Sequence, residues 1–157
     1  MIQTTKDIEI NGVNLRLYKI DPFKQERIIN SVGPALINII VAVYALRQNK
    51  PDSSEIFEKA VNEFFKTLPD KARHDLIFND LLSDDAIKIV VQGTEMPLIG
   101  KAQNGAKTVM NSELNDLIYL YEAAFASFKF NFTTFFSRGS SLCQNPYISS
   151  LIQKSKI

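Results

Sequence analysis

The sequence predicts a mainly α-helical, bundle-like single domain that begins with a β-hairpin. Two observations favour this fold class. Apolar residues recur three and four positions apart through most of residues 21–136, and the pair Asn11-Gly12 separates two short β-type runs near the N-terminus. With 157 residues, 45% of them hydrophobic, the chain is long enough to bury one core. We expect a domain over residues 1–136 and a flexible tail over residues 137–157.

The N-terminal hairpin is predicted from the segments DIEI and VNLRLY, which flank Asn11-Gly12. Both residues of this pair tolerate the positive φ angles of a type I′ turn. Val13, Leu15 and Leu17 alternate with polar residues, which gives the second strand one apolar face. A hairpin alone is marginally stable, so we expect it to lie on helices. Whether it only caps the core, or also exposes an edge for self-association or a partner strand, stays open.

Several helices follow the hairpin. Asp21-Pro22 begins the first, because Asp is a good N-cap and Pro suits the first helical position. The apolar run over residues 35–46 predicts a central core helix and is too short to cross a membrane. Residues 53–69 and 70–83 each have apolar side chains at helical spacing, which predicts two amphipathic helices.

Residues 86–112 allow two alternatives. The β-branched run IKIVV and the pair Asn104-Gly105 indicate a second small hairpin near residues 86–110. Alternatively, the first part continues the preceding helix. The three glycines and one proline of this segment favour a mobile loop.

The clearest predicted helix comes last, with Ser112 as its cap. Apolar residues spaced 4, 3, 4, 3, 4 and 3 apart form a seam that we expect to fill the core: Leu114, Ile118, Tyr121, Phe125, Phe128, Phe132 and Phe135. A weaker apolar line follows the opposite side: Tyr119, Ala123, Ala126 and Phe130. A helix that is apolar on two sides is buried twice or leaves one side for a partner. The candidate partner-binding residues are therefore Tyr119 and Phe130, together with Phe132, Phe135 and Phe136 at the Phe-rich end.

The sequence contains no constellation typical of an enzyme. One histidine, His74, and one cysteine, Cys143, cannot form a metal site rich in nitrogen and sulfur, and we predict no catalytic residue, cofactor or metal. Gly93, Gly100 and Lys101 do not form a phosphate-binding loop, because the glycines are too far apart and alanine follows the lysine. A formal net charge of +1 disfavours nucleic-acid binding. The single cysteine and the polar N-terminus predict a cytosolic protein.

Two segments, the N-terminal hairpin with the start of the first helix and the last helix, resemble one protein family. The chain opens with IEINGVNLRLYKIDPFKQ and reaches NDLIYLYEAAFASFKFNFTTFF in its last helix. In this order the two segments resemble the tail assembly chaperones of long-tailed bacteriophages and prophages. The residues that match the family pattern are Ile10, Asn11, Gly12, Ile20, Asp21, Phe23, Lys24 and Gln25, and then Asn131, Phe132, Phe135 and Phe136. The resemblance covers roughly a third of the chain.

The resemblance implies a non-catalytic late protein of virion assembly. Such chaperones bind amphipathic helices of the long tape-measure protein in the host cytoplasm, assist tail-tube assembly, and are absent from the mature virion. Self-association stays open, and neither nucleic acid nor membrane is an expected partner. Two alternatives are a structural virion component, such as a minor tail or head-completion protein, and a small helical DNA-binding regulator. The near-zero net charge disfavours the regulator.

Overall fold

The computed structural model describes residues 4–32 and 53–137. The predicted core helix over residues 35–46, the lone Cys143 and the predicted tail lie outside the described residues. The chain divides into two units. The sheet unit comprises Met1–Lys24 and His74–Phe132, and the helical unit comprises Gln25–Arg73 and Thr133–Ile157.

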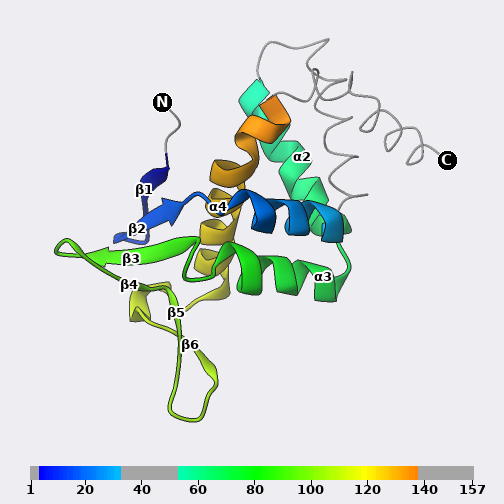
Figure 1. Ribbon diagram of the computed structural model, residues 1–157. Coiled ribbons are helices and arrows are strands. Elements are labelled where there is room, and N and C mark those ends of the chain that lie inside the picture. The colour runs from blue at the N-terminus through cyan, green and yellow to red at the C-terminus, as the bar shows by residue number, and fades with distance from the viewer. Residues whose placement is uncertain (1–3, 33–52, 138–157) are drawn as a thin grey trace. The chain divides into compact units, whose positions relative to one another are not determined.

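A four-stranded antiparallel sheet dominates the sheet unit (Figure 1). Its strands, in the order β1-β2-β3-β4, are β1 (Thr5–Ile10), β2 (Val13–Tyr18), β3 (Ile87–Val91) and β4 (Thr94–Pro97). Leu15 of β2 lies opposite Ile8 of β1 and Ile89 of β3, so β2 is a central strand. The hairpin is thus part of the core structure. The prediction of a mainly α-helical bundle is wrong, because helices and a substantial sheet share the chain.

The turn between β3 and β4 explains this error. Gln92 and Gly93 have φ angles of 51° and 79°, close to the 49° and 79° of Asn11 and Gly12. The Asn-Gly turn was predictable and is confirmed. Gln enters the left-handed region less readily than Asn, so Gln92-Gly93 gives no clear turn signal. Without that signal, β3 and β4 could not be recognised as a tight hairpin.

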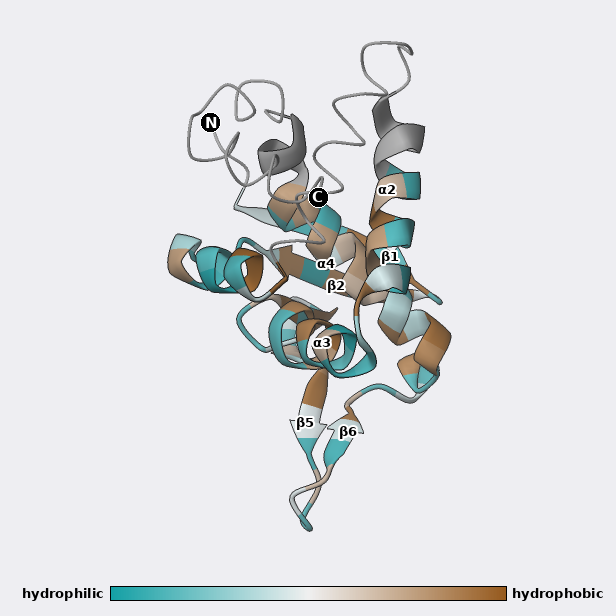
Figure 2. Cartoon of the chain, turned by 90° about the vertical axis from the view of Figure 1, so that its right-hand side faces the viewer, coloured by the Kyte–Doolittle hydropathy of each residue, from teal (hydrophilic) through white to brown (hydrophobic). Residues whose placement is uncertain are grey.

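A second, two-stranded sheet projects from the sheet unit as an arm (Figures 1 and 2). It consists of β5 (Ile99–Lys101) and β6 (Lys107–Val109), with Lys101 opposite Lys107. The arm is hydrophobic at its base and hydrophilic at its outer end (Figure 2). A Cβ atom on Gly100 would lie 2.4 Å from the Met110 sulfur, so glycine allows the close approach at the base. The hairpins β3–β4 and β5–β6 therefore lie in the region where the sequence predicted, as one alternative, a single small hairpin.

One face of the four-stranded sheet is apolar. Alternate residues of β2 and β3 are buried on it: Val13, Leu15, Leu17, Ile87 and Ile89. Helix α4 (Leu117–Ser137) runs beside the sheet in Figures 1 and 2. It contributes Ala124, Phe128 and Phe132 to the buried residues. Helix and sheet face together form the main core of this unit.

The predicted helix over residues 70–83 is present in two forms. α3 (Asp70–His74) is α-helical, and η1 (Asp75–Leu81) is a π-helix. The Leu82 N–H donates to the Ile77 carbonyl five residues earlier, as the wider π-helical turn requires. The expected apolar residues of this segment are nevertheless buried: Leu76, Ile77, Leu81 and Leu82.

In the helical unit, α2 (Ser53–Thr67) confirms the helix predicted over residues 53–69. Its described apolar face is buried: Ala60, Val61, Phe64 and, just beyond the helix, Leu68. Arg73 pairs with Asp70 at 2.6 Å one turn earlier. Residues 22–32 form a further helix, whose first turn belongs to the sheet unit.

Candidate functional site

The last helix begins later than its sequence predicts. Asn111 Oδ1 accepts the Glu113 N–H and starts a short 3-10 helix, η2 (Ser112–Leu114). Asp116 Oδ1 then accepts the Ile118 N–H at 3.1 Å and caps α4. Ser112, the predicted cap, lies in η2, so that detail of the prediction is wrong.

Two asparagines tie the α4 segment to the N-terminal hairpin. Asn11 Nδ2 donates to the Glu113 carbonyl at 2.8 Å, next to the hairpin turn. Asn131, which is 5% exposed, accepts the Ile20 N–H at 2.7 Å and donates to the Tyr18 carbonyl at 3.3 Å. The two sequence segments that resemble one family are therefore in direct contact in the fold.

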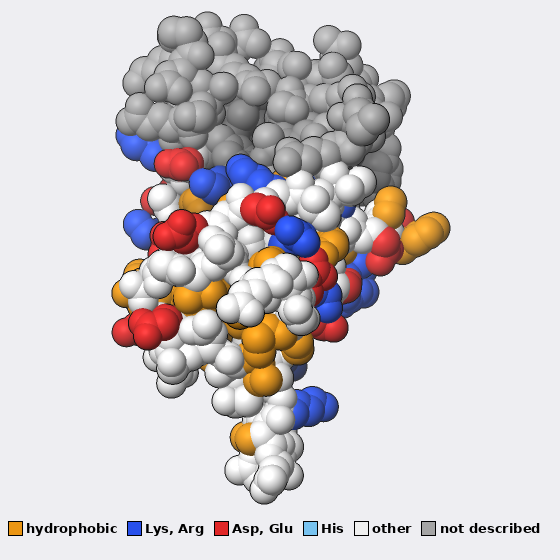
Figure 3. All heavy atoms as spheres, turned by 90° about the vertical axis from the view of Figure 1, so that its left-hand side faces the viewer, with side chains coloured by type: hydrophobic (Ala, Val, Ile, Leu, Met, Phe, Trp, Pro, Cys, Tyr) orange, Lys and Arg blue, Asp and Glu red, His pale blue; other side chains and the backbone are white. Residues whose placement is uncertain are grey.

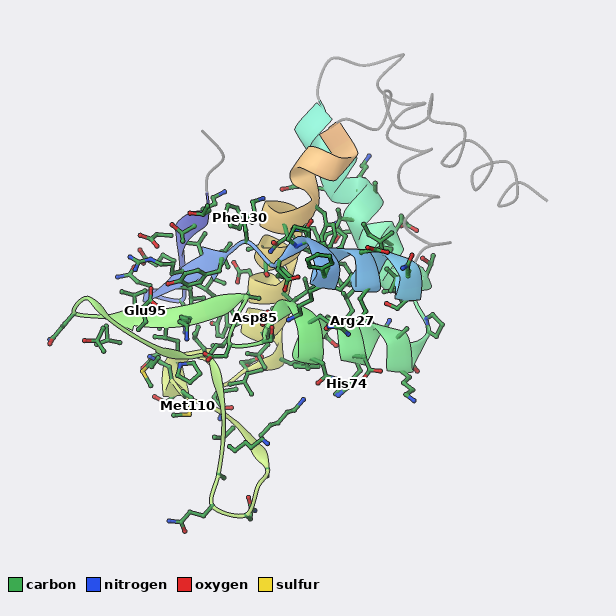
Figure 4. The ribbon with its side chains drawn as sticks, viewed as in Figure 1. Arg27, His74, Asp85, Glu95, Met110 and Phe130 are labelled. Carbon is green, nitrogen blue, oxygen red and sulfur yellow. The ribbon has the colours of Figure 1, made fainter. Side chains whose placement is uncertain are left out.

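The segment after β2 is fixed by its polar side chains. Asp21 Oδ1 accepts the N–H groups of Phe23 and Lys24 at 2.9 and 3.0 Å, which confirms the predicted N-cap. Lys24 Nζ lies 2.8 Å from Asp85, which Figure 4 labels. Burial raises the pKa of Asp85, but hydrogen bonds from Lys24 and a neighbouring serine outweigh it and leave the pKa lowered. Phe23 itself is 83% exposed.

The predicted seam is buried at Leu114 in η2 and again in the C-terminal half of α4, and it is exposed between them at the start of α4. Phe128 and Phe132 are at most 1% exposed, as expected of core residues. Ile118 and Tyr121 are 62% and 41% exposed, so the prediction that they fill the core is wrong. Leu117, 53% exposed, shares their side of the helix. We call Leu117, Ile118 and Tyr121 the open stripe.

The open stripe ends one turn further along α4. Phe125 is half-buried, and Lys129 Nζ lies 5.1 Å from the centre of its ring. The other large hydrophobic side chains that are exposed among the described residues are Phe23, Val91 and Met110. Figure 4 labels Met110 at the base of the arm, and Figure 3 shows hydrophobic side chains reaching the surface above the arm. The open stripe thus holds half of these exposed side chains within five residues of one helix.

The candidate partner-binding residues lie in different environments. Tyr119 and Phe130 are half-buried, and Phe132 is buried. Lys19 Nζ lies 4.2 Å from the centre of the Phe130 ring and also donates to the Phe130 carbonyl. Burial lowers the pKa of Lys19. The side chains of Phe135 and Phe136 lie outside the described residues. The apolar periodicity of the sequence did not reveal that the residues of the open stripe are exposed.

The polar face of the sheet carries a charged cluster. Arg16 lies 2.8 Å from both Asp7 and Glu95, and the Tyr18 hydroxyl donates to the same Glu95 oxygen. The hydrogen bond from Arg16 lowers the pKa of Asp7, and those from Tyr18 and Arg16 lower the pKa of Glu95. Figure 4 labels Glu95 on this sheet. Because the cluster joins three strands through mutual pairing, its evident role is to hold the strands together.

The residues that the sequence excluded from catalysis or phosphate binding lie apart. His74 is exposed and its ring lies 4.9 Å from that of Phe78. Gly93 and Gly100 belong to two hairpins, whereas a phosphate-binding loop connects a strand to a helix. In the described ranges, no three His, Cys, Asp or Glu side chains gather in a way that could hold a metal ion. No helix within those ranges has the length and apolar character needed to cross a membrane.

Comparison with known proteins identifies the family. The family model described as "Phage tail assembly chaperone protein, TAC" matches residues 11–142. No curated protein and no solved structure matches the chain. The matched range begins at the Asn11 turn and includes all of α4, so it contains both asparagine contacts between the hairpin and the last helix. The chain therefore belongs to the phage tail assembly chaperone family.

Proposed function

We propose that this chaperone binds amphipathic helices of the tape-measure protein on the open stripe of α4 during tail assembly. Two observations support the proposal. The family model covers most of the chain, and Leu117, Ile118 and Tyr121 are exposed on one side of a helix. Exposed apolar groups on one helical side suit docking of a second amphipathic helix, whose own apolar face would otherwise aggregate.

The open stripe favours weak and reversible binding. Fully burying a Leu or Ile side chain contributes about 1.5–3 kcal/mol, and the stripe residues already bury part of their surface. Association itself costs on the order of 4–15 kcal/mol in lost translational and rotational freedom. One stripe therefore holds a helix only loosely. A long tape-measure chain is then shielded when many chaperone molecules occupy its apolar segments at the same time, each binding and releasing independently.

Other residues of α4 contribute to the proposed contact in different degrees. Tyr119 and Phe130 are half-buried, so each has some ring area left for a partner. Phe132 is 1% exposed and has almost none. Phe135 and Phe136 remain candidates from the sequence alone. We therefore propose the open stripe as the main contact and Tyr119 with Phe130 as a second contact line.

The proposed role is non-catalytic and confined to assembly in the bacterial host cytoplasm. A chaperone acts before the tail is complete, so we expect the chain to be absent from purified virions. Mass spectrometry of the virions measures this directly. Detection of the chain at the copy number of a tail component would support the virion-component alternative instead.

Co-expression with the tape-measure protein of the same phage tests partner binding. The wild-type chain should keep the tape-measure protein soluble and co-purify with it. The double variant Leu117→Ser, Ile118→Ser should lose most of this capture, whereas Val91→Ser should keep it. Val91 is a matched control, because it is 48% exposed and lies on β3. Circular dichroism should show wild-type secondary structure for both variants, which establishes that each is folded.

Two outcomes would contradict the proposal. An insoluble tape-measure protein in the presence of folded wild-type chain would argue against chaperone action on this partner. Undiminished capture by a folded stripe variant would keep the chaperone role and remove the stripe as its site.

A further inference from the structure

We infer that the segment docking on the open stripe is an amphipathic helix with basic residues beside its apolar face. The identification of that segment with part of the tape-measure protein rests on the proposed function. The charge preference itself rests on the side chains around Leu117, Ile118 and Tyr121.

The chain segment that contains the open stripe carries one sign of charge. Between residues 108 and 128 the sequence has three carboxylates, Glu113, Asp116 and Glu122, and neither lysine nor arginine. All three are exposed. At 100° per residue, Glu122 lies about 40° from Ile118 around the helix axis, whereas Asp116 caps the N-terminus of α4 and Glu113 lies in η2 before it. A docked helix therefore meets Glu122 along one edge of its apolar face, and Asp116 and Glu113 near the N-terminal end of α4.

These three carboxylates have no cationic partner among the described residues. Other carboxylates of the sheet unit differ in this respect. Asp7 and Glu95 pair with Arg16, while Asp84 pairs with Lys88 and Asp85 with Lys24. The negative charge beside the stripe is therefore available to an external cation, whereas these other charges are already matched.

The basic residue nearest to the stripe along α4 marks its boundary. Lys129 lies over the ring of Phe125, beyond the last stripe residue. A helix seated on Leu117, Ile118 and Tyr121 thus lies over the acidic part of α4. Electrostatic complementarity of this kind selects among apolar helices that otherwise bind equally well.

The expected preference is moderate and depends on salt. Two exposed charge pairs together strengthen binding by about twofold to 30-fold. Replacing both cations with carboxylates adds repulsion, so a helix with acidic flanks should bind more weakly still. Screening reduces both effects, because the Debye length falls from about 10 Å at 0.1 M salt to about 3 Å at 1 M.

Two designed peptides test the inference with the full-length chain. Both have the same leucine face, and the residues on each side of it are lysine in one and glutamate in the other. Fluorescence anisotropy of labelled peptides gives the dissociation constants at low and high salt. The variant Asp116→Asn, Glu122→Gln removes the two carboxylates nearest to the stripe in sequence, and asparagine keeps an N-cap at the start of α4. Glu9→Gln is the control, because Glu9 is an exposed carboxylate on β1.

The inference requires that the wild-type chain and Glu9→Gln prefer the lysine peptide by at least about twofold at low salt. It also requires that the double variant and high salt remove the preference. Equal binding of both peptides, preference for the glutamate peptide, or binding of neither overturns it. These outcomes are separate from tape-measure capture. Loss of capture with an intact charge preference contradicts the proposed function alone, and intact capture without a charge preference contradicts the inference alone.

Discussion

Asn131→Ala should lower the free energy of unfolding by about 2–4 kcal/mol. The Asn131 side chain accepts the Ile20 N–H at 2.7 Å and donates to the carbonyls of Tyr18 and Ser127 at 3.3 and 3.0 Å. Each hydrogen bond contributes about 0.5–1.5 kcal/mol net, and a buried group that loses its partner costs about 1–3 kcal/mol. Because Asn131 is 5% exposed, water replaces these bonds only in part.

Urea unfolding followed by circular dichroism measures this loss. The control is Asn14→Ala, which changes an exposed asparagine of β2 and should stay within about 0.5 kcal/mol of wild type. If Asn131→Ala is as mild as Asn14→Ala, the contact between the hairpin and α4 does not stabilise the fold as we describe.

Asn131→Asp adds a pH signature to the same contact. Aspartate still accepts the Ile20 N–H, but its carboxylate cannot donate to the two carbonyls. Burial and these carbonyls should raise its pKa above the usual value of about 3.9. The destabilisation is therefore fully present above the raised folded-state pKa and shrinks as the pH falls through it. Asn131→Ala should show no such recovery, and equal pH profiles of the two variants would contradict this account.

Three further predictions concern other parts of the sheet unit. Ser127→Ala should keep or slightly raise the melting temperature, because Ser127 Oγ is buried and has no hydrogen-bond partner among the described residues; a loss of unfolding free energy above about 1 kcal/mol would contradict this. Phe128→Asp should unfold the unit, because it places a carboxylate in the core. Phe130→Asp should leave the unit folded, because residue 130 is half-buried and the Lys19 amine lies next to it. Equal melting temperatures of the two variants would contradict the assignment of helix faces. Arg16→Ala should destabilise most at neutral pH. Arg16 lowers the pKa of its two carboxylate partners, so the stabilisation it provides is present above about pH 4 and is lost as the pH falls through their lowered pKa values. A difference in unfolding free energy between Arg16→Ala and wild type that stays constant from pH 7 to pH 3 would contradict this.

Local chemistry in the sequence predicted the elements that depend on it. The positive φ angles of Asn11-Gly12 and the cap made by Asp21 both follow from the preferences of those residue types. The sheet required information that is not local. Gln92-Gly93 forms the same tight turn with a less typical residue, and the order of four strands depends on pairing between residues 15 and 89.

The candidate site was predictable only in part, because periodicity shows which residues share a helix face and not what covers that face. Counting from Phe128 toward the N-terminus correctly places Ile118 and Tyr121 on one seam. It does not reveal that these two positions are exposed while Leu114, earlier on the same seam, is buried. The start of α4 was missed for a similar reason, since Ser112 and Asp116 are both good caps. Asn11, which is far from Glu113 in sequence, donates to the Glu113 carbonyl. This contact lies in η2, just before α4 begins, and local sequence does not reveal it.

Site-specific photocrosslinking during co-expression tests the central claim most directly. A photoreactive residue at Ile118, in the open stripe, should crosslink to the tape-measure protein in cells that make both chains. The same residue at Val91, an exposed apolar position on β3, should not. Crosslinking at Ile118 alone is the predicted result. Equal crosslinking at both positions, or crosslinking at Val91 only, would contradict the claim that this chaperone holds its partner on the open stripe.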